Sequence, residues 1–266
     1  MTKHYFLDSS ALLGLTFFSD RWFQEAYPLY NDRRKLHISE LVLREYCNYE
    51  KNSDKVKAPE DASQIDPDWN TEAGKFGDLK DDLKEPLSEY TRQIRRLDRS
   101  GMVLEDAIET FIDHFEIREE AEPQIRAYFE DKFEERVVNA HYVNKYSQEL
   151  IDRVLYTSKK NRTKLAQEIT VHKSRYDTAD RIKTKWNELP DASVHDPDLS
   201  ILVDATVVAN RRKIDYFVSG DSDHLAVQKI GNDYFDLSII SISDTFHPTS
   251  GLPQAKKQKS PQKETS

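Results

Sequence analysis

The sequence has few of the residues on which several classes of protein depend. A single cysteine, Cys47, occurs in 266 residues, which excludes an internal disulfide and a zinc site built from several thiolates. No run of about 18 apolar residues is present, so no segment is predicted to cross a membrane as a helix. The histidines lack the HExxH spacing of zinc proteases, and no Walker loop, GxSxG or GxGxxG motif occurs. Zinc proteases are therefore disfavoured, and nucleotide-driven chemistry has no support.

Glycine is also scarce, with 7 residues against 10 prolines, a balance that favours long helices. Charged residues make up 33% of the chain and apolar residues 37%, so we expect a charge-rich surface over one or two domains. The net charge of −9 argues against a protein that coats nucleic acid through bulk charge. It is compatible with a nuclease, because a site that holds metal ions is itself acidic. Asp8 stands where a signal peptide needs apolar residues, so we expect a cytoplasmic protein.

Strand and helix patterns alternate at the two ends of the chain, whereas the middle is helical. Short apolar runs predict strands at 4–7, 36–39, 216–218 and 237–242, and helical periodicity dominates 78–189. Alternation predicts an α/β fold with a mainly parallel central sheet and helices on both faces. The predicted organisation is a discontinuous core, a helical insertion and a disordered basic tail. These parts comprise residues 1–52 with 196–250, residues 53–195, and residues 251–266.

Acidic residues stand at the predicted strand ends and on the helices that follow them. In parallel sheets ligands bind beyond the carboxyl ends of the strands, where Asp8 and Asp221 are expected. Two like charges about 4 Å apart repel by about 4 kcal/mol at an effective dielectric constant near 20, so such a cluster requires protonation or divalent cations. Oxygen ligands without cysteine or histidine favour Mg²⁺ or Mn²⁺, whose typical use here is phosphodiester hydrolysis. A single acid at a strand end is more often a helix cap, so the set carries the signal. Its members are Asp8, Glu45, Asp198, Asp204, Asp221 and Asp223.

Five segments, in order, resemble the motifs of PIN-domain nucleases, and two of them also resemble the related NYN branch. The resemblance covers about 3–50 and 196–248 and implies a PIN-like α/β/α sandwich with metal-dependent nuclease activity, usually on RNA. The segments are Phe6-Leu7-Asp8-Ser9-Ser10-Ala11-Leu12, Ile38-Ser39 with Val42 and Glu45, 198–205, 216–223 and 239–246.

The resemblance also implies roles for individual side chains. Asp8, Glu45, Asp221 and a third acid would hold the metal ions, Asp223 would be an auxiliary acid, and Ser9 and Ser219 would support the site through hydrogen bonds. Two residues compete for the third position, and we favour Asp198 over Asp204. Asp198 has the family's spacing to Ala205, whereas Asp204 lies closer in sequence to Asp221.

The long insertion, about 145 residues between the second and third motifs, departs from compact members of the family. Residues 104–135 carry 12 acidic and 3 basic side chains, whereas 136–185 carry 12 basic and 5 acidic ones with tyrosines and Trp186 among them. A basic face with aromatic rings suits RNA, but two oppositely charged helices can also neutralise each other or bind a protein partner. The predicted RNA contacts are Lys159, Lys160, Arg162 and Lys164.

The sequence thus predicts a Mg²⁺- or Mn²⁺-dependent endoribonuclease, either the toxin of a toxin–antitoxin or defence pair or an RNA-processing enzyme. The partners expected are an RNA substrate, an antitoxin or other protein partner, and a second copy of the chain in a homodimer. The competing hypotheses are a non-catalytic RNA- or protein-binding module on the same fold, and a metal-dependent phosphatase or DNA nuclease. An aspartyl phosphatase would need a second acid at position 10, where Ser10 stands.

Overall fold

The computed structural model describes most of the chain outside the predicted tail. Residues 251–266 lie outside the described residues, so the prediction of a disordered tail is not addressed. The described residues are 2–17, 34–47, 68–71, 74–117, 119, 121–173, 176–189, 194, 196–211 and 214–246.

Five parallel strands form one sheet in the order β3-β2-β1-β4-β5. The α/β class and the parallel sheet expected from the sequence are confirmed. β1 has β2 on one side and β4 on the other, so the order of the strands reverses at β1 and β4. In parallel sheets such a reversal opens a crevice at the carboxyl ends of the two strands. The strands are β1 (Lys3–Leu7), β2 (Arg34–Ser39), β3 (Thr170–His172), β4 (Tyr216–Ser219) and β5 (Ile239–Ser241).

The edge strand β3 corrects one prediction, since the segment 53–195 is not wholly helical. Thr170–His172 pairs with β2, with Ile38 opposite Val171. The β-branched run Ile169-Thr170-Val171 explains the strand. Three residues are too few for a periodicity signal, which requires about four or more, so the strand could not be separated from the helices around it.

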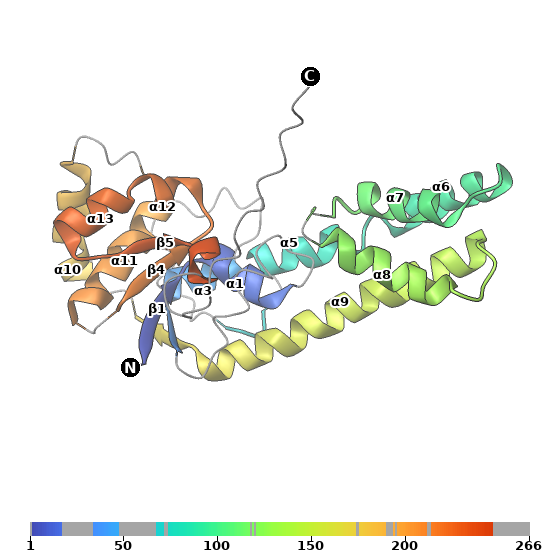
Figure 1. Ribbon diagram of the computed structural model, residues 1–266. Helices are drawn as coiled ribbons and strands as arrows, with labels where there is room; N and C mark the ends of the chain where they lie inside the picture. The colour runs from blue at the N-terminus through green and yellow to red at the C-terminus, as the bar shows by residue number, and fades with distance from the viewer. Residues whose placement is uncertain are drawn as a thin grey trace, which may run out of the picture.

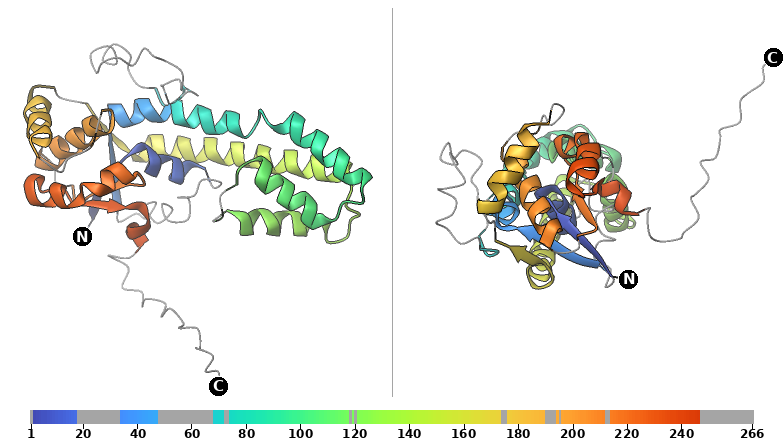
Figure 2. Two further views of the ribbon diagram at one scale, coloured as in Figure 1. Left: turned by 90° about the horizontal axis from the view of Figure 1, so that it is seen from above. Right: turned by 90° about the vertical axis from the view of Figure 1, so that its left-hand side faces the viewer.

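Helices cover both faces of the sheet (Figures 1 and 2). In Figure 1, α10, α11 and α13 lie to one side of the strands and α1 and α3 to the other. Trp186 of α10 is fully buried, and its ring stacks on Phe235 of α13 with 4.1 Å between centroids, so the last part of the predicted insertion packs within the α/β layers. These helices are α1 (Ser9–Thr16), α3 (Glu40–Cys47), α10 (Tyr176–Asn187), α11 (Asp198–Arg211), α12 (Ser222–Ala226) and α13 (Gln228–Phe235), with a 3₁₀ turn η2 (Ile242–Phe246) after β5.

The remaining helices form an arm that projects from the α1 and α3 side of the sheet (Figure 1). Its longest helix has 29 residues and is about 43 Å long at 1.5 Å per residue. Buried aromatic rings join the helices, with Tyr90 against Phe111 and Phe111 against Phe129. No helix among the described residues is long and apolar enough to cross a membrane. The arm consists of α5 (Gly74–Asp82), α6 (Leu87–Arg99), α7 (Leu104–His114), α8 (Glu122–Phe133) and α9 (Ala140–Glu168).

Candidate functional site

Asp8 joins the ends of the two central strands. It is 2% exposed and stands between β1 and α1 as the N-cap of that helix. Its Oδ1 accepts hydrogen bonds from the Ala11 N–H at 2.9 Å and the Ser10 hydroxyl at 2.8 Å, and the Ser219 hydroxyl at the end of β4 donates to Oδ2. The Ser10 hydroxyl oxygen also accepts from the Gly220 N–H at 2.8 Å. Asp8 therefore fixes the geometry of the crevice between β1 and β4.

His224, which the sequence reasoning missed, completes this network. Its Nδ1 lies 3.0 Å from the Ser219 hydroxyl oxygen and 3.5 Å from Oδ2 of Asp8, and its Nε2 lies 3.3 Å from the carbonyl oxygen of Asp198. The Ser219 hydroxyl donates to Asp8, and the carbonyl oxygen of Asp198 only accepts, so these contacts favour a proton on each ring nitrogen of His224, which is the imidazolium form.

The electrostatics of the pair agree with this protonation. Burial alone would lower the pKa of His224, but the hydrogen bond and charge of Asp8 outweigh it, and the pKa is raised. Burial alone would raise the pKa of Asp8, but His224, Ser219 and the Ala11 N–H lower it. The sequence signal was present, because His224 is three residues after Asp221 on the same short helix. That position matches no zinc-binding spacing, so the zinc motifs do not mark it.

Three other carboxylates meet close to this network. Asp198 begins α11, Asp221 caps α12, and Asp223 lies in the first turn of α12. One carboxylate oxygen from each lies within 4.8 Å of the other two. The pKa of Asp198 is raised by burial first, and then by the negative charges of Glu45 and Asp221. Such a group of carboxylates is stabilised by a bound cation, and its all-oxygen donor set suits Mg²⁺ or Mn²⁺.

Glu45 approaches the same crevice from α3, but a lysine of the arm pairs with it. The Ser39 hydroxyl accepts from the Val42 N–H at 3.4 Å and so caps the start of α3. The Lys75 ammonium lies 2.7 Å from Glu45 Oε1 and donates to the Ser9 hydroxyl oxygen at 2.9 Å. Burial alone would lower the pKa of Lys75, but Glu45, and then Asp8 and Asp198, raise it.

The local conformation of α5 explains how Lys75 reaches the site. Gly74 begins the helix with φ of 64°, a left-handed conformation that costs other residues about 1 kcal/mol or more. The glycine permits this conformation at the start of α5, and Lys75 follows in the first turn of the helix. The role of Lys75 could not be predicted from the sequence, because this lysine stands among polar residues in a segment without a motif.

Asp204, the alternative third acid, does not join the other carboxylates. It is buried within α11, six residues after Asp198, and at about 100° per residue the two side chains leave the helix in different directions. Among the described acids, the group at the crevice contains Asp198 and not Asp204.

Comparison with known proteins identifies no relative of this chain. The chain matches no family model, no curated protein and no solved structure.

The predicted RNA contacts lie on α9 but differ in exposure. Lys159, Lys160 and Lys164 are exposed, and Lys164 lies 3.9 Å from Glu168. Arg162 is a correction, because it is 6% exposed. Its guanidinium donates to the Thr71 carbonyl oxygen at 2.8 Å and lies 4.3 Å from the Phe76 ring centroid, so Arg162 fastens α9 to α5 rather than facing solvent.

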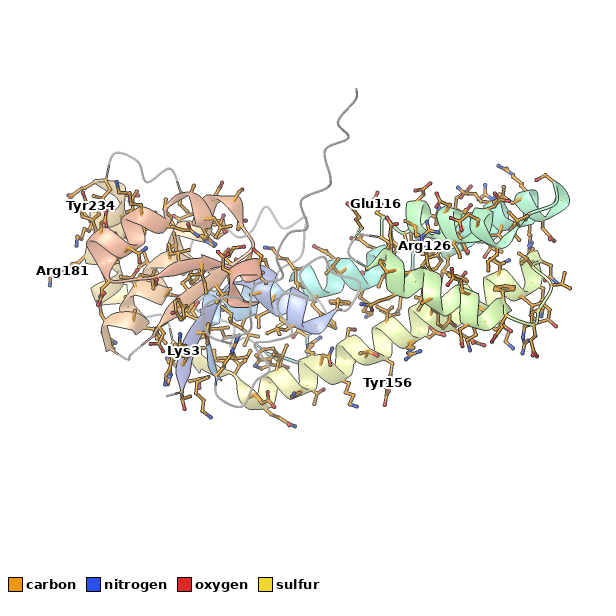
Figure 3. The ribbon with its side chains drawn as sticks, viewed as in Figure 1. Lys3, Glu116, Arg126, Tyr156, Arg181 and Tyr234 are labelled. Carbon is orange, nitrogen blue, oxygen red and sulfur yellow. The ribbon has the colours of Figure 1, made fainter. Side chains whose placement is uncertain are left out.

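The described aromatic residues among the bases also differ in exposure. Tyr146 and Trp186 are buried and belong to the core, so neither is available to stack on a base. Tyr156 is 72% exposed and projects from α9 (Figure 3). A pocket of about 220 Å³ lies beside Lys159, where α9 faces Trp69. Among the described residues, the exposed bases of α9 are thus accompanied by the exposed ring of Tyr156 and by the partly buried rings of Tyr142 and Trp69.

The oppositely charged segments meet only partly in ion pairs. Arg126 of α8 pairs with Glu105 and Glu109 of α7 at 2.6 and 2.5 Å, which are contacts within the acidic segment. Between α8 and α9, Lys132 lies 3.7 Å from Glu149. In that pair the base, Lys132, belongs to the acidic segment and the acid, Glu149, belongs to the basic segment. These contacts therefore do not neutralise the excess charge of either segment.

Proposed function

We propose that the chain is a metal-dependent endoribonuclease with a PIN-like core. The observation that carries this proposal is the convergence of Asp198, Asp221 and Asp223 beyond the carboxyl ends of the strands, where the sheet order reverses. The order of the acidic motifs along the sequence is the second support. A crevice of this kind is the usual ligand site of parallel α/β sheets.

Each residue of the site has a role in this proposal. Asp198, Asp221 and Asp223 would hold one Mg²⁺ or Mn²⁺ ion. When bound, the ion supplies an activated water and charge stabilisation for the phosphate. Asp8, with Ser219 and His224, keeps the ends of β1 and β4 in register so that the carboxylates of α11 and α12 face one another.

RNA is the substrate that we infer, from the resemblance and from the exposed face of α9. Lys159, Lys160 and Tyr156 supply positive charge and a ring, the two groups that bind phosphates and unpaired bases. A toxin acting with an antitoxin and an RNA-processing enzyme are both consistent with this site, as are a cytoplasmic location and a homodimer. Toxicity on expression that Asp221→Asn abolishes would favour the toxin.

The test compares the wild type with Asp198→Asn, Asp221→Asn and the control Asp233→Asn, which changes an exposed acid of α13. Each protein is incubated with total RNA and with single-stranded DNA in Mg²⁺, Mn²⁺ or chelator. We expect the wild type and the control to cut RNA only with metal, and the two site variants to lose about a hundredfold or more in rate. Equal cutting by wild type and both site variants would refute the assignment of the site.

A non-catalytic RNA- or protein-binding module is the second candidate, and one observation favours it. The two oxygens of Asp8 already accept three hydrogen bonds, and Oδ2 also lies 3.5 Å from Nδ1 of His224, so most of the acceptor capacity of this acid is taken by the protein rather than by a metal ion. Calorimetric titration with Mn²⁺ separates the two functions. Failure to bind at millimolar Mn²⁺, together with retained RNA binding, would support the module.

A further inference from the structure

The carboxylate centre, by which we mean Glu45, Asp198, Asp221 and Asp223, already contains a positive charge supplied by the protein. Lys75 lies 2.7 Å from Glu45 and 2.9 Å from the Ser9 hydroxyl oxygen. It comes from α5, the first described helix of the arm, whereas the carboxylates come from the α/β layers. The ammonium is therefore delivered to the site by a part of the chain that the motifs do not include.

Glu45 is the acid most affected by this contact. It follows β2 on α3, and its side chain is 15% exposed, so its charge is largely withheld from water. A carboxylate in this position either binds a cation or pairs with a base. Lys75 fulfils that requirement, and Glu45 is not part of the group formed by Asp198, Asp221 and Asp223.

The ammonium also retains capacity for a ligand. A lysine has three N–H donors, and Glu45 and Ser9 account for two of them. Its side chain is 42% exposed, so the third donor can reach a group that enters the crevice from solvent. An anionic oxygen is the partner that an ammonium beside a metal-binding carboxylate cluster would take.

We propose that Lys75 is a built-in cation of the carboxylate centre. It takes the charge of Glu45, which limits the centre to one divalent ion at Asp198, Asp221 and Asp223, and it donates its remaining N–H to a phosphate oxygen of the substrate. This inference rests on the proposed function and adds to it a fixed metal stoichiometry and a phosphate contact made by the arm.

The experiment titrates metal-free full-length protein with Mn²⁺ by calorimetry and measures RNA cleavage on the same samples. The variants are Lys75→Met, Lys75→Arg and the control Lys84→Met, which changes an exposed lysine just beyond α5. Methionine keeps the aliphatic stem of lysine, and circular dichroism checks that each variant is folded.

We expect one Mn²⁺ per chain for the wild type, for Lys75→Arg and for the control. Lys75→Met should bind a second Mn²⁺ through the released Glu45, or bind the first about tenfold more tightly. Its RNA cleavage should fall about a hundredfold, the usual cost of removing one donor to a reacting anion. Unchanged stoichiometry, with an affinity within twofold of the wild type, would overturn the proposal.

A double variant separates the two roles of Lys75. Glu45→Gln/Lys75→Met removes both charges, so Mn²⁺ stoichiometry should return to one while cleavage remains low. Cleavage restored to the wild-type rate would overturn the phosphate contact. If the wild type itself neither binds Mn²⁺ nor cuts RNA, the proposed function fails and this inference fails with it. If the wild type does both and Lys75→Met behaves identically, the inference alone is refuted.

Discussion

Replacing Asp8 by asparagine distinguishes a carboxylate that organises the site from one that binds a metal ion. Asparagine keeps the N-cap contact with Ala11, because it is as good a capping residue as aspartate. It presents a neutral amide to Ser219 and to the imidazolium of His224. The variant therefore removes one partner of a buried ion pair and leaves the shape of the site nearly unchanged.

The expected cost follows from the burial of the pair. Both side chains are almost wholly inaccessible, and removal of one partner from a buried ion pair costs about 3–5 kcal/mol. We expect about 3 kcal/mol, because deprotonation of His224 relieves part of the loss. At about 2–4 °C per kcal/mol for a chain of this size, the melting temperature should fall by roughly 6–12 °C.

The pH dependence gives the sign of the effect. The pKa of His224 is raised by folding, so its contribution to stability is complete below about pH 6.5, the unfolded value, and is lost as the pH rises through the folded pKa. The pKa of Asp8 is lowered, so its contribution is complete above about pH 4 and is lost in stronger acid. The difference between wild type and Asp8→Asn should therefore be largest between about pH 4 and 6.5.

The assay is thermal or urea denaturation in chelator across that pH range. Asp223→Asn is the matched control, because it changes an acid of the group formed with Asp198 and Asp221 and should not destabilise the metal-free protein. If Asp8→Asn melts within 2 °C of the wild type in chelator at pH 5 and loses stability only when Mn²⁺ is added, Asp8 is a metal ligand and the reasoning is wrong.

Three further predictions concern residues outside the carboxylate centre. Arg162→Met should lower the free energy of unfolding by about 2 kcal/mol, since it removes a charged hydrogen bond. Lys160→Ala should weaken RNA binding in a filter assay without shifting the melting temperature. Loss of stability in Lys160→Ala, or weaker RNA binding without loss of stability in Arg162→Met, would contradict these assignments. Burial raises the pKa of the Cys47 thiol to about 12, so a disulfide reagent at pH 8 should label it only in urea, and rapid labelling of the folded chain would show that the thiol is accessible. Trp186→Ala should cost about 3–5 kcal/mol in urea unfolding, because the stacked ring is fully buried; a loss below 1 kcal/mol would contradict the packing of α10 on the α/β layers.

The sequence was most informative where local patterns and the fold coincide. Apolar runs that end in acids predicted four strands of the sheet, because a buried parallel strand needs only a few consecutive apolar residues. Asp221 and Asp223 follow one of these runs, and the helix pattern that begins at Asp198 placed this acid in the same expected cleft. That cleft was also expected to hold Asp8, Glu45 and Asp204. The choice between Asp198 and Asp204 required the helix itself, because the two differ in the direction of their side chains.

The parts that the sequence could not predict depend on contacts between distant segments. Lys75 reaches Ser9 across 66 positions, and Asp8 meets Ser219 across 211, and no local pattern encodes either meeting. Arg162 was predicted to be a surface base because it is flanked by lysines and polar residues. Its burial follows from the approach of Phe76, which only the packed structure reveals.

The arm leaves the α/β layers after α3 and returns through α9 to β3, so it is anchored at both ends beside neighbouring strands. The boundaries of the arm therefore limit how it can be exchanged for another. The outer helices α6, α7 and α8 can vary in length or be replaced by a different fold without changing the composition of the crevice. An exchange that begins before α5 removes Lys75, and one that extends beyond α9 into Thr170–His172 removes the edge strand. The outer end of the arm can thus diverge in sequence, whereas α5 and the end of α9 are inherited together with the α/β layers that they contact.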